Sequence, residues 1–239
     1  MSPATRTTIR VLGSVLALVM VLSAALSAMT YAFRHSATTT HELSPELTSV
    51  ELVNDVGTVR VHAVDAGEQP RAVARATGSF LDPSHEVTES GGTASLDGQC
   101  PSGLWVGPCD VEWQLYVPAG TAVSVITSVG DIQVTGTDAT VRAEASVGTV
   151  TVRGVTADTV DATTSVGDVV VDLAAPPSVL TATTSTGSID VTVPDGGTAY
   201  RVRSTTSLGS QTTTVPVDND SPHRLELLTS VGDITVHPR

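Results

Sequence analysis

Aromatic side chains are scarce in this sequence of 239 residues, and lysine is absent. Phe, Trp and Tyr together make up 3% of the chain, whereas 40% of the residues are hydrophobic. A hydrophobic core can therefore form, but it must be thin and aliphatic, because few large side chains are available to fill a wide interior. The length allows one or two domains.

Positive charge is also scarce. The 12 basic residues are all arginines and oppose 25 acidic residues. All 25 acidic residues follow residue 40, and nine arginines follow residue 34, so this part of the chain carries 9 − 25, or −16 charges. A surface of this sign repels phosphate backbones, which excludes nucleic acid from the expected partners.

Charged residues are missing from Val11 to Phe33. A helix of this length reaches roughly 35 Å, which exceeds the ~30 Å hydrocarbon layer of a bilayer. Arg6 and Arg10 precede the stretch, so we expect residues 1–10 in the cytoplasm, residues 11–33 as a single-pass signal anchor in a bacterial cell membrane, and the remainder outside the cell. The alternative is a signal peptide cleaved after Ala32, with secretion of the domain.

A glycine-centred heptapeptide recurs along the exported part. "SVGDIQV" at Ser128 returns at intervals of 18 to 23 residues, and apolar residues alternate on both sides of each glycine. A period near twenty with two short alternating strands per repeat predicts an all-β fold, a β-solenoid of about seven two-stranded turns. We expect the glycines at structural corners, because a turn there needs positive φ. They are Gly57, Gly130, Gly148, Gly167, Gly187, Gly209 and Gly232.

Polar columns accompany the corner glycines. We expect the serines two residues before them to form a hydroxyl ladder that satisfies corner backbone groups. Opposite charges share outward slots in neighbouring copies, which predicts cross-strand pairs. The pairs are Arg142 with Asp161, Arg203 with Glu226, and Arg153 with Asp172. The ladder serines are Ser128, Ser146, Ser165, Ser185, Ser207 and Ser230.

The glycine numbering gives the simplest stacking order, from Gly57 to Gly232. In this order the Gly209 copy is the weakest turn, because Ser204, Gln211 and Thr213 occupy slots that are apolar elsewhere. The last turn then offers an open edge, with Pro238 and Arg239 as guards against strand pairing. We expect a monomer, with self-association as the alternative.

The regular pattern stops between residues 62 and 121. Within the domain of residues 46–239, we interpret this stretch as a non-repeat β insertion that forms a small antiparallel layer over the first turns. Residues 34–45, which include "HSATTTHEL", are expected to be a polar tether.

Two cysteines lie in the insertion, with eight residues between them. In an exported chain Cys100 and Cys109 favour a disulfide, and two buried free thiols are the alternative. Trp105, at the middle of the loop, is a candidate contact residue, because a short closed loop presents an aromatic ring at low entropic cost. Alternatively Trp105 folds back and covers the first turn together with Trp113 and Tyr116.

Catalytic, cofactor-binding and metal-ligating patterns are not found. Asp131, Asp168 and Asp233 follow corner glycines, but they are about 9.6 Å or more apart, too far for one calcium ion. The six histidines are scattered, and the nucleophile motif GxSxG does not occur.

The recurring "TSVGDIxV" corner, the "VPAG" before the first regular turn and the detached "DVGTVRV" copy resemble the putative adhesin family, a bacterial cell-surface β-solenoid domain of unknown function. The resemblance covers residues 46–239. It implies an extracellular protein engaged in adhesion or envelope sensing, with no catalytic residues to carry over.

Three functions follow as hypotheses. The first is a membrane-anchored, non-enzymatic cell-surface module that binds an envelope or neighbouring-cell component, anchored in the lipid bilayer by the N-terminal helix. The second is a regulatory module that reports envelope stress through a partner membrane protein. The third is a hydrolase or lyase, which would require a cleft with basic residues that the sequence does not indicate.

Overall fold

The computed structural model describes residues 13–25, 33–65, 67–102 and 108–239. Residues 13–25 form a helix. In these ranges no helix combines the length and the hydrophobicity that a membrane crossing requires. The predicted span from Val11 to Phe33 includes residues outside the described ranges, so the membrane anchor stays a prediction.

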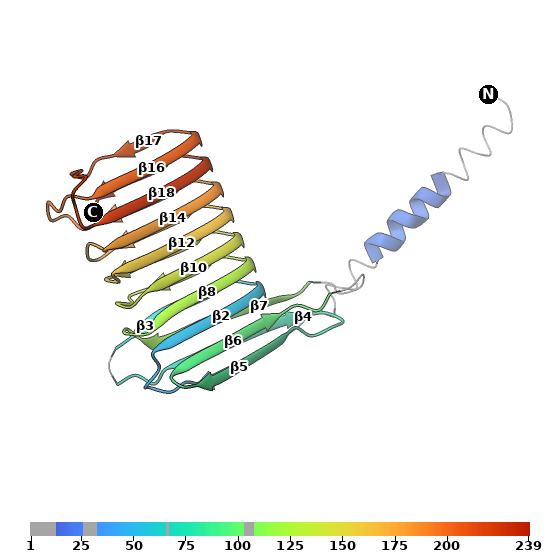
Figure 1. The fold of residues 1–239 in the computed structure, drawn as a ribbon. Helices are drawn as coiled ribbons and strands as arrows, with labels where there is room; N and C mark the ends of the chain where they lie inside the picture. Colours follow the sequence, from blue (N-terminus) through green and yellow to red (C-terminus); the bar gives the residue numbers. More distant parts are fainter. Residues whose placement is uncertain (1–12, 26–32, 66, 103–107) are drawn as a thin grey trace, which may run out of the picture.

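From His35 onward the chain forms two facing β-sheets that run along one axis (Figure 1). Sheet 1 consists, in spatial order, of β1 (His35–Glu42), β4 (Arg71–Gly78), β7 (Asp110–Pro118), β3 (Val59–Val64), β9 (Ile132–Thr135), β11 (Val150–Val155), β13 (Val169–Leu173), β15 (Ile189–Val193), β19 (Ile234–Pro238) and β17 (Gln211–Thr213). Sheet 2 consists of β16 (Arg201–Leu208), β18 (Arg224–Val231), β14 (Val179–Thr186), β12 (Thr159–Val166), β10 (Val141–Val147), β8 (Ala122–Val129), β2 (Ser49–Val56), β6 (Thr93–Gln99) and β5 (Ser84–Ser90).

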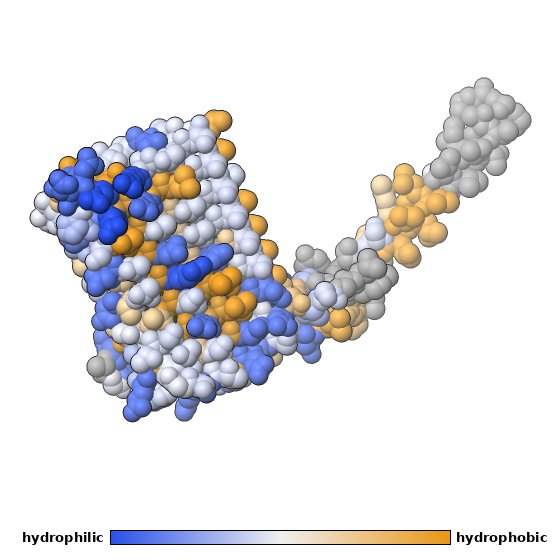
Figure 2. Space-filling model, in the orientation of Figure 1, coloured by the Kyte–Doolittle hydropathy of each residue, from blue (hydrophilic) through white to orange (hydrophobic). Residues whose placement is uncertain are grey.

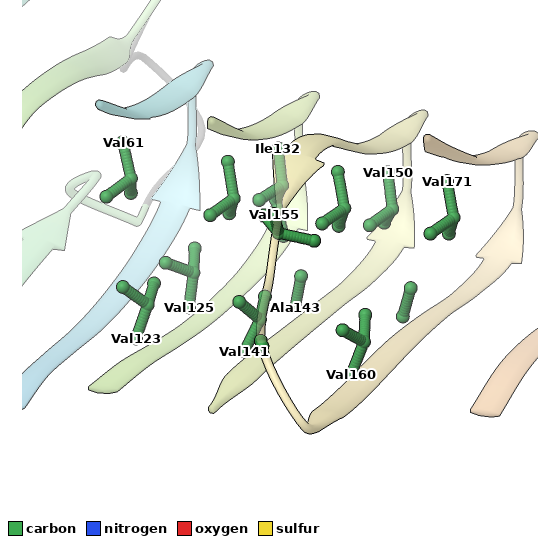
Figure 3. Packing of buried hydrophobic residues seen from close by; sticks show 14 of the residues in the cluster. Val61, Val123, Val125, Ile132, Val141, Ala143, Val150, Val155, Val160 and Val171 are labelled. Carbon is green, nitrogen blue, oxygen red and sulfur yellow. The ribbon is translucent and has the colours of Figure 1, made fainter. Parts of the chain in front are cut away.

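The repeating unit is a coil, which we name after its corner glycine. Each coil is a sheet 2 strand, the glycine and a sheet 1 strand, and like strands of successive coils pair in parallel. The alternating apolar residues of both strands point inward and meet between the sheets (Figure 3). In the Gly148 coil, for example, Val141, Val150 and Val152 are fully buried. The mainly parallel β-solenoid expected from the period is therefore confirmed.

The stacking order differs from the glycine numbering at one end. β18 pairs with both β14 and β16, and β19 pairs with both β15 and β17. The Gly232 coil therefore lies between the Gly187 and Gly209 coils, and the Gly209 coil ends the stack. The prediction of sequential stacking was wrong here. The physical reason is polarity: Leu225 and Leu227 are buried in the Gly232 coil, whereas the corresponding Val202 and Ser204 remain partly exposed at the end.

The expected open edge at the C-terminus is also wrong. β19 is covered on both sides, and the Arg239 backbone N–H donates to the carbonyl of Val193 at 2.9 Å. The Arg239 guanidinium reaches Asp172 Oδ1 at 2.6 Å. Arg239 thus ties the inserted coil to the Gly167 coil and does not guard an edge.

The insertion at residues 62–121 continues the solenoid instead of covering it. β6 pairs in parallel with β2, and β7 pairs in parallel with β3, so β6 and β7 form an additional coil. The described residues therefore contain eight coils. β5 and β4 then extend the two sheets in antiparallel fashion. The antiparallel strands predicted from the sequence exist, but they lie at the edges of the sheets because their backbone groups pair with the end coil.

The expected polar tether, residues 34–45, includes strand β1. All eight residues of β1 pair antiparallel with β4, and this pairing ends sheet 1. The sequence of β1 has no apolar alternation, and most of its side chains are exposed. The strand therefore owes its order to backbone pairing with β4, which composition does not reveal.

The predicted register of the outward charges agrees with the pairing. Arg142 lies opposite Asp161, and Arg203 lies opposite Glu226. The ion pairs themselves are different, since Arg142 contacts Glu144 of its own strand at 3.4 Å. Exposed pairs of this kind contribute little to stability, so their exchange has little cost.

Candidate functional site

The glycine corner is the most regular feature of the molecule. All seven corner glycines have φ between 131° and 151°, a region that side chains rarely adopt. A methyl group at Gly148 would overlap the carbonyl oxygen of Gly130, and the same overlap recurs along the stack. The corner therefore requires glycine both for its φ and for the close approach of neighbouring coils.

A buried threonine ladder satisfies the corner carbonyls. In the four coils of Gly167, Gly187, Gly232 and Gly209, the residue three before the glycine is a threonine that points inward, and its hydroxyl donates to the glycine carbonyl of the preceding coil in the stack. Thr164 donates to Gly148 O at 2.9 Å, and Thr184 donates to Gly167 O at 2.9 Å. Thr229 and Thr206 repeat this bond toward Gly187 and Gly232.

The serines two residues before the glycines, which the motif predicts in this role, do not have it, so that prediction was wrong. These serines are exposed, and within the described residues none of them has a hydrogen bond to the corner. The alternation of side chains along a strand explains why the threonine and not the serine makes this bond. Positions seven, five and three before the glycine face inward, whereas the serine position faces out.

The aspartates after the corner alternate with hydroxyl residues. Asp131 Oδ1 accepts the backbone N–H of Thr149 at 2.8 Å, and Asp168 Oδ1 accepts that of Ser188 at 2.8 Å. Asp233 Oδ1 accepts both the N–H and the hydroxyl of Ser210. These two bonds from Ser210 lower the pKa of Asp233. Each carboxylate thus binds the neighbouring coil, which is a structural task.

This alternation also shows the true stacking order. In spatial order the column after the glycine reads Thr58, Asp131, Thr149, Asp168, Ser188, Asp233 and Ser210. The alternation is complete only when the Gly232 coil precedes the Gly209 coil. This alternation is present in the sequence, but the prediction of stacking in the order of the glycine numbers did not take it into account.

In five of the seven glycine coils an exposed apolar residue stands immediately before the corner glycine; the Gly57 coil has the partly exposed Val56 there and the Gly187 coil has Thr186. We call this row the corner rib. Val129, Val147 and Val231 are each 47% exposed, Val166 is 50% exposed and Leu208 is 70% exposed. In spatial order the corner rib consists of Val56, Val129, Val147, Val166, Thr186, Val231 and Leu208. Figure 2 shows the hydrophobic row along the right-hand edge of the solenoid.

The corner rib is exposed because the chain turns there. By strict alternation the residue before the glycine would face inward, as the threonine two places earlier does. The chain turns at the glycine, and the residue directly before it lies exposed at the outer edge. Exposed apolar rows of this length are unusual on soluble proteins and indicate an interaction surface.

The cysteine loop takes the place of a glycine corner in the additional coil. Cys100 and Cys109 form a disulfide with a Cα–Cα distance of 6.0 Å. Asp55 Oδ2 accepts the N–H of Cys100 at 3.0 Å, which fixes the loop beside the Gly57 corner. Trp105 lies outside the described residues, so its role as a contact residue stays a prediction. Trp113 is fully buried.

The other surfaces offer little chemistry. A cavity of about 430 Å³ is lined by three prolines, Gly67, Val64, Ala119, Gln69 and the acidic side chains of Asp65 and Glu68, and these described lining residues include no histidine, serine or cysteine. Among the described residues no group of three or more histidine, cysteine or acidic side chains could hold a metal ion.

Comparisons with known proteins agree with the fold. The family model described as Toastrack DUF4097 matches residues 46–237. A putative cell adhesion protein from Clostridium sporogenes superposes with a TM-score of 0.53 at 12% identity, over 86% of this chain and 100% of that chain. A putative adhesin from Bacteroides fragilis has a TM-score of 0.48 at 14% identity, over 86% of this chain and 97% of that chain. No curated protein matches the chain.

These likenesses concern the fold, because the identities are low. The family match covers the repeat, its corner glycines and the cysteine loop, and it agrees with the resemblance to the putative adhesin family noted from the repeated motif. Since the match extends over most of the sequence, the chain belongs to the Toastrack DUF4097 family.

Proposed function

We propose that the chain is a membrane-anchored, non-enzymatic cell-surface module that binds an envelope or neighbouring-cell component through its glycine-corner edge. The observation that carries this proposal is the corner rib, a row of exposed or partly exposed aliphatic side chains, interrupted only by Thr186, along one edge of the stack. Apolar rows that remain in water are retained where a partner covers them.

Two further points support a surface role. The uncharged stretch from Val11 to Phe33 favours an anchor with the domain outside the cell. The disulfide between Cys100 and Cys109 suits an oxidising compartment. The name of the Clostridium sporogenes structure, a putative cell adhesion protein, is in line with this role.

Site-specific photocrosslinking in intact cells tests the proposal. A photoreactive residue replaces Ser165 beside the corner rib, and in a control it replaces Thr163, which faces outward on the same strand. We expect crosslinks to an envelope component from position 165 and few from position 163. Equal yields from both positions, or none from either, would contradict the proposal. A single membrane protein captured from position 165 would favour the regulatory function over adhesion.

A further inference from the structure

The chain enters the domain at the same edge that carries the corner rib. β1 begins at His35, directly after the uncharged stretch and Arg34. Arg34 contacts Asp110 at 3.5 Å, and Asp110 begins β7 just after the cysteine loop. Pairing of His35 with Gly78 places the start of β1 on the corner side of sheet 1.

Exposed apolar side chains gather along this edge. Phe33 is 55% exposed and its ring centroid lies 5.9 Å from that of Phe80. Twelve large apolar side chains of the described residues after 32 are exposed, and eight of them lie on the corner edge. These eight are Phe33, Phe80, Leu81, Val129, Val147, Val166, Val231 and Leu208. The apolar edge therefore begins where the N-terminal stretch joins the domain.

The shape of the corner rib indicates which kind of partner can cover it. Six steps of about 4.8 Å give a straight row of roughly 29 Å, one side chain wide, on a convex edge. A stable dimer buries roughly 800 Å² per partner, far more than one such row provides. A protein partner would also need a matching groove. A bilayer surface needs none, because lipids rearrange around an apolar side chain at the headgroup boundary.

We infer that the corner edge lies on the outer surface of the bilayer that holds the N-terminal stretch, so that the solenoid rests lengthwise on the membrane with the corner rib among the lipid headgroups. This inference rests on the anchor in the proposed function. The partner that the corner rib meets is then lipid from the same membrane.

The charge of the domain and its tether to the membrane determine which lipids the corner rib can contact and how strong that contact must be. The exported part carries −16 charges, and Asp131, Asp168 and Asp233 lie one residue beyond the corner glycines, so anionic lipids weaken the contact and zwitterionic lipids suit it. The contact is weak for a free domain. The anchor raises the effective concentration of the membrane to about the millimolar range or above, which makes a weak contact sufficient.

Energy transfer from the full-length chain in phosphatidylcholine vesicles tests the inference. A donor dye is placed on Ser128→Cys or on Ser207→Cys, and the vesicles carry an acceptor on their headgroups. Both serines are exposed beside the corner rib, and the native cysteines are joined in the disulfide. The two coils are five steps, about 24 Å, apart in the stack. We expect equal transfer from both positions, whereas an upright solenoid would give much lower transfer from position 207.

Two triple variants make the test specific. Val147→Thr, Val166→Thr and Val231→Thr together remove apolar groups from the corner rib, and Thr186 in the same column shows that threonine fits there. The control changes Val53, Ile126 and Leu228 to threonine on the outer face of sheet 2, where Thr163 and Thr183 occur naturally. We expect the rib variant to lose transfer from position 207 at least several-fold and the control to retain it.

Each of the other possible results of these experiments contradicts one specific part of the inference. Equal transfer in both triple variants, or an upright wild type that still floats with the vesicles, overturns the lengthwise orientation and leaves the proposed function standing. A chain that fails to float with the vesicles overturns the anchor and with it this inference. Transfer between two labelled chains in place of transfer to lipid identifies a second copy as the occupant and overturns the assignment to lipid.

Discussion

The Gly232 and Gly209 coils have the same design and opposite surroundings. In the Gly232 coil, Leu225, Leu227 and Ile234 are 2% exposed or less, because coils cover both sides. In the Gly209 coil, Gln211 is exposed and Ser204 is partly exposed. The later coil in the sequence is therefore the inner coil. The comparison teaches that apolar content, not chain order, decides which coil is buried and which ends the stack.

The largest expected effect comes from Leu227→Ala compared with Ser204→Ala, since these two residues are direct neighbours in the register. Leu227→Ala leaves a cavity between two covered coils and should lower the free energy of unfolding by about 2–5 kcal/mol. Ser204→Ala loses one hydrogen bond to Gln211 and should cost less than about 1.5 kcal/mol. Urea unfolding of the two variants measures both values. Equal losses would mean that the Gly209 coil is also an inner coil.

Glycine substitution should show the same contrast at the corner. Gly167→Ala places a methyl group against the Gly148 carbonyl between two fixed coils, with backbone strain of about 1–3 kcal/mol and steric overlap in addition. Gly209→Ala meets the Gly232 carbonyl, but the end coil can move away because no coil covers its other side. We expect a clearly lower thermal midpoint for Gly167→Ala than for Gly209→Ala. The reverse order would contradict the end position of the Gly209 coil.

The sequence predicts the coil and the corner well because both depend on local pattern. Inward residues such as Val150 and Ile189 follow from period two, and the corner glycines follow from the motif. The stacking order is different, because neighbouring copies in sequence need not be neighbours in space. That information was carried by the alternating column of Asp168, Ser188 and Asp233 and by the polar inward positions of the Gly209 coil.

Other features escaped prediction for physical reasons. β1 has no apolar alternation, since it is held by backbone bonds to β4. The coil of β6 and β7 lacks a corner glycine, because the disulfide loop replaces it. The corner rib was present in the motif as the residue before each glycine, but alternation alone assigns that residue to the core. The turn at the glycine ends the buried strand, so this residue is exposed instead.

Hydrogen exchange should order the coils by coverage. The backbone amides of β16 have one neighbouring strand, whereas those of β12 have two. We therefore expect faster amide exchange in β16 than in β12 under native conditions, because local opening requires fewer broken contacts. Exchange measured by mass spectrometry distinguishes the two strands. Equal protection would show that the stack opens only as a whole.

If the Gly209 end of the stack were apolar, two copies of the chain should associate through it. The triple variant Ser204→Leu, Gln211→Ile and Thr213→Val gives the exposed Gly209 coil the interior of a covered coil. We expect concentration-dependent association in sedimentation, because an apolar open end favours stacking on another copy. The control Thr205→Leu with Thr212→Ile adds apolar groups to outward positions of the same strands. Monomers from the triple variant, or equal association of both variants, would contradict the idea that the polar inward residues of the Gly209 coil keep the end of the stack from associating.

The smallest expected effect concerns His237 of the inner coil. Its hydrogen bond to the Pro238 carbonyl, together with Asp190, raises its pKa above the ordinary value of 6.5. A raised folded-state pKa gives stability that is present at low pH and is lost as the pH rises through that pKa. The wild type should therefore lose a little more stability between about pH 5.5 and about pH 8 than His237→Gln does. Thermal unfolding at the two pH values shows whether the slopes differ.

The inserted position of the last coil has a consequence for synthesis. A chain that leaves the ribosome from its N-terminus can add coils one at a time as far as the Gly187 coil. The Gly209 coil then emerges before the strands it pairs with in the native stack, because β18 and β19 lie between it and the Gly187 coil and are made last. At ordinary rates of translation this wait lasts on the order of seconds. Assembly of the far end is therefore a closing step that requires the final residues, and a chain truncated before Arg224 would leave β16 and β17 without the partners they pair with.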